Sequence, residues 1–109
     1  GTIYISDTGN NRILQVSNSG KWKKISYGSG TGAGYFSRPR GITIDKSGVI
    51  YVADYKNDRV QYFDGRWHII SGNLSGPIDV AIDTENRILV ADVNNDHIAI
   101  YGKTSGLWS

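Results

Sequence analysis

Short apolar runs alternate with polar turns along the chain. In the segment 41–71 the runs are GITID, VIYVAD, RVQYF and RWHIIS, and the turns between them are KSG, YKND and DG. Apolar residues two positions apart, such as Ile42 and Ile44, point to one face of a β-strand. No segment keeps helical spacing over the ~10 residues that a helix needs. The pattern therefore predicts an all-β chain with four short antiparallel strands in each unit.

The unit occurs three times. The stretch IYVADYKNDRV at 50–60 returns as ILVADVNNDHI at 88–98 and as IYISDTGNNRI at 3–13. Between the second and third copies the register is exact, since Asp54 and Asp92 are 38 positions apart. A glycine-rich loop, GSGTGAGYFSRPRG at 28–41, lengthens the connection between the first two copies. A period of about 40 residues with four strands per unit is typical of a β-propeller blade.

The chain has 109 residues, the size of one domain. We expect a partial blade at 1–27, a linker loop at 28–38, and blades at 39–72 and 76–109. A closed propeller usually has about 4 to 8 blades, so the ring is expected to be incomplete within this chain. The chain is then a fragment of a longer propeller or a unit that closes a ring with copies of itself. The absence of methionine favours a piece of a longer protein or a processed product.

The pattern P-x-G-[IV]-x-[IV]-D, a turn, then I-Y-V-A-D-x-x-N-x-R-[IV] resembles the NHL repeat. The residues that carry it are Pro39, Gly41, Asp45, Asp54, Asn57 and Arg59, then Pro77, Asp83, Asp92 and Asn95, with Asp7, Asn10 and Arg12 in the first copy. The resemblance implies NHL-type propeller blades, in most known cases part of a six-bladed ring. The third copy departs from the pattern, with His97 in place of the arginine and Asp79 in place of Gly41.

The recurring D-x-x-N-x-R segment predicts architecture more than chemistry. Asp and Asn side chains at strand ends bond the nearby backbone and fix turns, and a repeated Arg can tie one blade to the next. Calcium binding by Asp54, Asn57 and Asp58 is the alternative, but no glycine and distal Glu follow as in a calcium-binding helix–loop–helix motif. We therefore assign Asp7, Asn10, Arg12, Asp54, Asn57, Arg59, Asp92 and Asn95 to the structural repeat.

Catalysis and cofactors are not expected from these residues. A catalytic zinc needs about three protein ligands, and the chain has only two histidines, His68 and His97, on different strands. Pro39 and the β-run GITID follow the glycine loop, where a phosphate-binding loop would open a helix. We expect neither an enzyme nor a cofactor or metal. The alternative is part of an NHL-like propeller lyase or hydrolase with a metal site completed by other blades.

The amino-acid composition limits the classes of partner that the chain is expected to bind. The formal net charge is +2 and basic residues are scattered, which does not favour nucleic acid. Lys21, Lys23 and Lys24 flank Trp22, as expected for lysines that protect an edge strand. No apolar run reaches the ~20 residues of a membrane span. The absence of cysteine is compatible with an extracytoplasmic location but leaves the compartment unknown.

The partner site is expected on the face where the connections between blades and the turns between the second and third strands meet. Loops on a rigid scaffold carry much recognition, and Tyr, Phe and Arg are typical interface anchors. We predict binding of a protein or peptide there, with an RNA-binding surface as the alternative. The predicted contact residues are Tyr35, Phe36, Arg38, Arg40, Tyr55, Lys56, Asn94 and His97.

Overall fold

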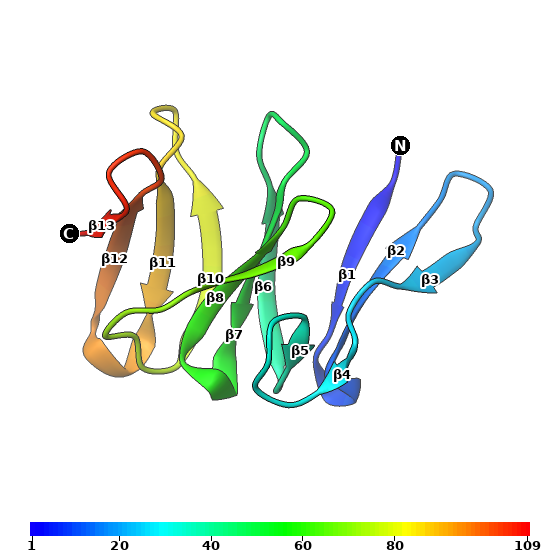
Figure 1. Cartoon of the computed structure of the whole chain (residues 1–109), viewed down its shortest axis with the longest axis horizontal. Coiled ribbons are helices and arrows are strands. Elements are labelled where there is room, and N and C mark those ends of the chain that lie inside the picture. Colours follow the sequence, from blue (N-terminus) through cyan, green and yellow to red (C-terminus); the bar gives the residue numbers. More distant parts are fainter.

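Three antiparallel sheets follow one another along the chain in the computed structural model, which describes residues 1–109 (Figure 1). The first contains β1 (Ile3–Asp7), β2 (Arg12–Val16) and β3 (Trp22–Lys24). The second contains β6 (Pro39–Ile44), β7 (Ile50–Asp54), β8 (Arg59–Phe63) and β9 (Trp67–Ile70). The third contains β10 (Pro77–Ile82), β11 (Ile88–Asp92), β12 (His97–Gly102) and β13 (Leu107–Trp108). The prediction of an all-β chain with four-stranded antiparallel units is confirmed.

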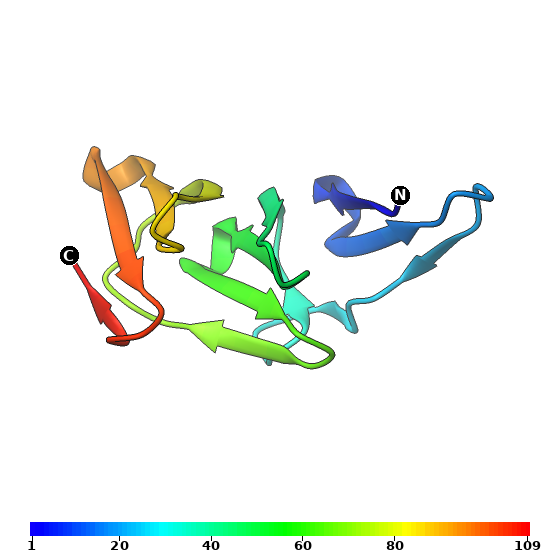
Figure 2. The same ribbon diagram turned by 90° about the horizontal axis from the view of Figure 1, so that it is seen from above.

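The sheets fan out as blades of an incomplete propeller (Figure 2). In the second and third sheets β6 and β10 lie on the inner side of the arc, and β9 and β13 lie on the outer side. The first sheet has three strands and the ring does not close. We call the sheets the first, second and third blades from here on.

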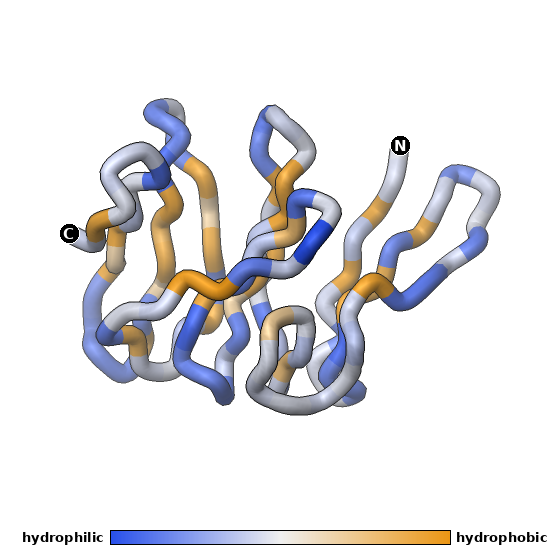
Figure 3. Tube along the Cα trace, viewed as in Figure 1, coloured by the Kyte–Doolittle hydropathy of each residue, from blue (hydrophilic) through white to orange (hydrophobic).

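The hydrophobic core lies between the blades. Tyr51 and Val60 of the second blade pack against Val80, Ile88 and Val90 of the third. A second cluster joins the first blade to the second through Ile13, Phe36, Ile50, Val52 and Trp67. The apolar segments accordingly lie along the strands and the polar ones at the turns (Figure 3). Burying each large aliphatic side chain contributes about 1.5–3 kcal/mol, so the blades are stabilised mainly by their neighbours.

Each blade makes the same turn between its second and third strands, as the repeat predicts. The turns are η1 (Thr8–Asn10), η2 (Tyr55–Asn57) and η3 (Val93–Asn95), followed by Asn11, Asp58 and Asp96 with φ of 53°, 54° and 54°. Asn and Asp tolerate this left-handed backbone better than most residues. None of the helical segments is long and apolar enough to cross a membrane.

These turns and the connections between blades lie at one end of the blades, the lower end in Figure 1. We call this end the loop face, formed by the turns 8–11, 55–58 and 93–96 and the connections 28–38 and 71–76. We call the other end, with the turns 45–49 and 83–87, the hairpin face. The glycine-rich connection contains two short strands, β4 (Gly28–Ser29) and β5 (Tyr35–Phe36), which pair in parallel.

Tryptophans on the outer strands bind the preceding blade. The indole Nε1 of Trp67 donates to the carbonyl of Ile25 at 2.8 Å, and that of Trp108 donates to the carbonyl of Ser71 at 2.8 Å. Trp22 has the equivalent place in the first blade, where no preceding blade is present, and 60% of it is exposed.

Candidate interaction surface

The Asp of the repeat motif is the centre of a buried polar network in the second blade. The side chain of Asp54 is fully buried and accepts hydrogen bonds from Arg59 Nε at 2.8 Å and Asn57 Nδ2 at 3.0 Å. The amide of Ser37 and Nε2 of Gln61 donate to the same carboxylate at 2.9 and 3.1 Å. Four donors therefore occupy the carboxylate that a calcium ion would need, which supports the structural assignment of Asp54.

The same network fixes the glycine-rich connection. Arg59 donates to three carbonyls of this segment, and Gln61 Nε2 donates to the carbonyl of Tyr35 at 2.7 Å. Gln61 Oε1 accepts from the amide of Gly34 at 2.8 Å, and Asn57 donates to the carbonyl of Gly30 at 2.8 Å. Five hydrogen bonds from side chains to its carbonyls, and one from its Gly34 amide to Gln61, therefore hold this connection against the second blade.

The network is weaker in the other two blades. In the first blade Arg12 donates to Asp7 at 2.7 Å in a half-exposed pair, and hydrogen bonds from Arg12 and Asn10 lower the pKa of Asp7 below its ordinary value. In the third blade Asp92 is buried and accepts from Asn95 Nδ2 at 2.7 Å, but His97 Nε2 lies 3.8 Å away. Histidine thus leaves the third blade without the bond that arginine makes in the others.

The motif arginines pair first with the aspartate of their own blade. Arg59 in addition donates to the connection that enters the second blade, whereas Arg12 donates to Asp7 alone. The left-handed turn residues add further bonds between blades: Oδ1 of Asn11 accepts the amide of Arg38 at 2.6 Å. Gln61 was also missed, although a polar residue where the other copies have Leu14 and Ala99 was a visible signal.

Phe36 is not a contact residue. Its side chain is fully buried, and its ring meets that of Trp67 edge to face at 4.9 Å between centroids. Burial of a complete aromatic ring between two blades makes it part of the core, so its prediction as a partner-binding residue is wrong. The neighbouring Tyr35 points the other way along β5, is 40% exposed and lies beside Tyr27 at 5.8 Å between ring centroids.

Four of the predicted contact residues gather on the loop face of the second blade. The guanidinium of Arg40 lies 4.4 Å from the centre of the Tyr55 ring, and Lys56 Nζ lies 5.7 Å from it. Arg38 precedes β6 at the same end of the blade and is exposed, as are Arg40 and Lys56. None of these three cations takes part in any of the ion pairs of the chain. We call Arg38, Arg40, Tyr55 and Lys56 the basic cluster.

The remaining two predicted contacts lie on the third blade. Asn94 is exposed, and its Nδ2 donates to Ser75 Oγ at 3.3 Å. His97 is also exposed, and its Nδ1 lies 3.0 Å from the carbonyl of Asn95. The exposed members of the predicted set are therefore Tyr35, the basic cluster on the second blade, and Asn94 and His97 on the third.

The chain does not bring together the side chains of a metal centre. No group of three or more His, Cys, Asp or Glu residues is close enough to hold a metal ion. His68 lies on the outer strand β9, with Nε2 3.0 Å from Asp64 Oδ1 and its ring stacked on Tyr62 at 4.6 Å. His97 is on β12 of a different blade.

The clear pKa shifts of buried groups lie on the hairpin face. Burial raises the pKa of Asp45, but hydrogen bonds from Lys103, two turn amides and the Tyr51 hydroxyl outweigh it and leave the pKa below its ordinary value. Burial lowers the pKa of Lys103, but its bonds with Tyr51 and Asp45 leave it raised. Lys103 comes from the third blade and Asp45 from the second, so this pair joins two blades.

Fold and repeat together define a segment of a β-propeller whose blades share one turn motif. The family model of the NHL repeat matches residues 36–63 and 74–101, just over half of the chain. The chain belongs to the NHL repeat family, and the resemblance seen in its sequence is confirmed.

Two relatives share this repeat. The chain is 37% identical over 73 residues to NHL repeat-containing protein 3 of Homo sapiens, across 62% of this chain and 21% of the relative. It is 50% identical over 40 residues to the E3 ubiquitin-protein ligase TRIM71 of Rattus norvegicus, across 36% of this chain and 5% of the relative. The chain thus spans about a fifth or less of these relatives.

Among solved structures the chain resembles propeller lyases in fold. A streptogramin B lyase structure superimposes with a TM-score of 0.84 at 22% identity, across all of this chain and 36% of the lyase. Virginiamycin B lyase from Staphylococcus aureus, in a catalytically inactive form with quinupristin, gives a TM-score of 0.81 at 19% identity, again across all of this chain and 36% of the lyase. At this identity the likeness shows the fold alone.

Proposed function

We propose that this chain is a non-catalytic interaction module that binds a protein or peptide through its loop face. The observation that carries the proposal is the basic cluster, where two exposed cations lie over one tyrosine ring, a third lies at the same end of the blade, and none of the three has a carboxylate partner in the chain. Unpaired Arg and Tyr side chains on a rigid surface are the residue types enriched at interface hot spots. Tyr35, in the glycine-rich connection of the same face, exposes a second aromatic ring.

The scaffold supports this role because it holds the loop face in place. The network around Asp54 and Arg59 fixes the glycine-rich connection on one side of the cluster. A fixed surface loses less conformational entropy on binding than a mobile loop would.

A random peptide library displayed on phage tests the proposal. We expect the wild-type chain to enrich peptides whose binding is lost in the double variant Arg40→Ala with Tyr35→Ala. The matched control, Lys46→Ala with Arg66→Ala, changes two exposed residues outside the loop face and should leave binding intact. Enriched peptides that bind both double variants equally would place the partner site elsewhere.

We also infer that copies of the chain associate through the open sides of the first and third blades. Ile3, Ile5 and Trp22 are exposed on one side, at positions that are buried as Ile50, Val52 and Trp67 in the second blade. Leu89, Ala91 and Ile98 line an apolar hollow on the third blade. Since the second blade buries the equivalents of both sides against its neighbours, the two open surfaces are of the kind that pack against another blade.

A further inference from the structure

The basic cluster is a feature of the second blade alone. Arg38, Arg40, Tyr55 and Lys56 correspond in the third blade to Gly76, Ile78, Val93 and Asn94, none of which is charged or aromatic. In the first blade Thr8 and Gly9 stand where Tyr55 and Lys56 stand in the second. A feature required by the blade architecture would recur with the repeat, as Asp54 does.

Arg38 occupies a backbone position that favours glycine. Its φ is 51°, and Gly76, at the same position of the third blade, has φ of 65°. A residue with a side chain costs about 1–2 kcal/mol there, and only glycine avoids that cost. Strained backbone of this kind is concentrated at functional sites. The second blade therefore holds a guanidinium on its loop face at the expense of local stability.

Arg40 and Lys56 share one aromatic ring. Both cations lie within cation–π distance of Tyr55, at 4.4 and 5.7 Å from the ring centre. Tyr55 thereby keeps two positive charges close together that would otherwise repel each other. Arg38, two residues before Arg40, brings a third charge to the same end of the blade.

We propose that the basic cluster binds an acidic segment of a protein partner, a short stretch of peptide rich in glutamate or aspartate. The inference rests on the proposed loop-face function and specifies the chemistry of the partner. Planar guanidinium groups bind carboxylates through paired, charge-assisted hydrogen bonds, which suits two arginines two positions apart. The lysine adds a point charge beside them.

The surroundings of the cluster fit a short acidic peptide better than a nucleic acid. Asp58 and Asp96 are exposed on the same face, one in each of two neighbouring turns, and would repel a long polyanion that crossed the blades. The Tyr55 ring is already covered by Arg40, so it does not offer an open platform for a base. The unpaired cations of the loop face are confined to the second blade, and a few carboxylates are enough to match them.

Fluorescence anisotropy with the full 109-residue chain tests the proposal. The probe is a labelled polyglutamate peptide, compared with polyglutamine and with oligouridylate RNA of the same length. We expect polyglutamate to bind, polyglutamine not to bind, and the affinity to fall as salt is raised. Arg40→Ala and Lys56→Ala should each weaken binding by about three- to tenfold, the range of a partly exposed charge-assisted contact.

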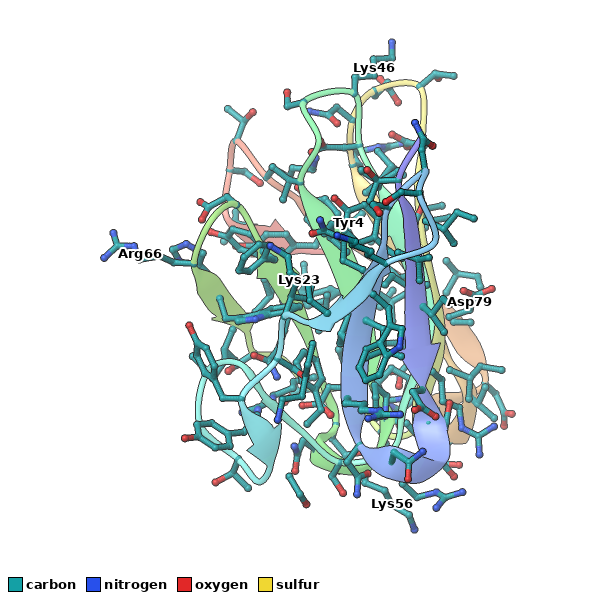
Figure 4. All side chains as sticks on the ribbon, turned by 90° about the vertical axis from the view of Figure 1, so that its right-hand side faces the viewer. Tyr4, Lys23, Lys46, Lys56, Arg66 and Asp79 are labelled. Carbon is teal, nitrogen blue, oxygen red and sulfur yellow. The ribbon has the colours of Figure 1, made fainter.

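Matched controls lie away from the cluster. Lys46 projects at the end of the molecule opposite Lys56, and Arg66 projects at the outer edge (Figure 4). Lys46→Ala and Arg66→Ala remove the same formal charge as the cluster variants and should leave polyglutamate affinity within twofold of wild type, because exposed charges this far apart are screened.

Arg38→Gly separates recognition from folding. Glycine relaxes the left-handed backbone, so this variant should have a higher Tm than wild type and yet bind polyglutamate more weakly. Equal polyglutamate affinity in the cluster variants and the controls would overturn the proposal, as would tighter binding of the RNA than of the peptide. If the phage library instead enriches loop-face peptides without acidic residues, the loop-face function stands and the acidic specificity fails.

Discussion

Asp58 accepts a hydrogen bond from the amide of Gly76 at 2.9 Å and so joins the turn of the second blade to the first strand of the third. Asn11 makes the same bond to the amide of Arg38 at 2.6 Å, one blade earlier. The left-handed residue that ends the turn of the first and of the second blade is therefore also the link to the next blade. Local turn chemistry and packing between blades depend on the same side chain.

Replacing Asp58 with Ala should lower the free energy of unfolding by about 2–3 kcal/mol. The change removes the acceptor of the Gly76 amide and places alanine in a left-handed conformation. Asp96→Ala is the matched control, because Asp96 has the same φ of 54° and its carboxylate accepts no hydrogen bond from the chain. Urea denaturation should give the control only the backbone part, about 1 kcal/mol. Equal losses would show that the bond between blades contributes nothing.

Removing Arg59 should destabilise the chain more than removing Arg12. Arg59→Ala leaves the buried carboxylate of Asp54 without its cation and removes three hydrogen bonds to loop carbonyls, a loss of about 3 kcal/mol. Arg12→Ala breaks a partly exposed pair that solvent screens, so its loss should be clearly smaller. Urea denaturation measures both, and hydrogen exchange at the Gly34 and Tyr35 amides should increase in Arg59→Ala. Unchanged exchange there would mean that Arg59 does not hold the loop.

Stability should depend on pH through Asp45 and Lys103, whose Nζ lies 2.9 Å from Asp45 Oδ2. Because the folded pKa of Asp45 is lowered, its contribution is present above its unfolded pKa, near about 4, and is lost as pH falls through the folded pKa. Because the folded pKa of Lys103 is raised, its contribution is complete below its unfolded pKa, about 10.4, and is lost as pH rises through the folded pKa.

Urea midpoints measured from about pH 2 to pH 8 test this pair. Asp45→Asn keeps an acceptor for the turn amides but removes the charge, so it should lower the free energy of unfolding at neutral pH by about 1–2 kcal/mol. The decrease in stability between neutral and acidic pH should also become smaller. Asp83→Asn is the counterpart in the third blade, where the cation is the more exposed Arg87 of the same turn. If stability fell as steeply with acidic pH in Asp45→Asn as in wild type, the Asp45–Lys103 pair would not be the source of the pH dependence.

The repeat allowed the fold to be predicted because each blade repeats its own local rules. Each copy of the repeat contains the alternation of apolar residues along its strands and the residue that ends its turn, which is Asn11, Asp58 or Asp96. The face of the strand to which a side chain points is also a local property. The side chains that it packs against there are not, because they come from distant parts of the sequence. From the sequence Phe36 was expected to be an exposed loop aromatic. Its burial depends on packing against Trp67, which lies thirty-one positions later on β9 of the second blade.

Hydrogen bonds between residues far apart in the sequence could not be predicted either. Gln61 is a single polar residue inside an apolar strand, and only the structure brings the loop carbonyls to its amide. Arg38, Arg40, Tyr55 and Lys56 lie at the loop face as expected, since they are close to turns whose positions the repeat fixes, and their role in binding stays a prediction. Site residues beside a repeated turn can be placed from the sequence, whereas those packed between blades cannot.

The exposure of Trp22 gives the last prediction. Trp67 and Trp108 each donate to a carbonyl of a preceding blade, and Trp22 lacks this acceptor. Trp22→Ser should therefore leave the unfolding free energy of the isolated chain within about 0.5 kcal/mol, whereas Trp67→Phe, which removes a partly buried hydrogen bond, should lower it by about 1–2 kcal/mol. Chemical denaturation at low concentration measures both.

The same residue should control association between copies. If the open sides of the first and third blades bind each other head to tail, the sedimentation coefficient should rise with protein concentration, and Trp22→Ser and Ile5→Lys should suppress the rise. Ile69→Ser is the control, since Ile69 is an exposed apolar residue of the second blade. A wild-type chain that stays monomeric at every concentration and melts cooperatively would refute self-association, because the open sides would then be stable in water without a partner.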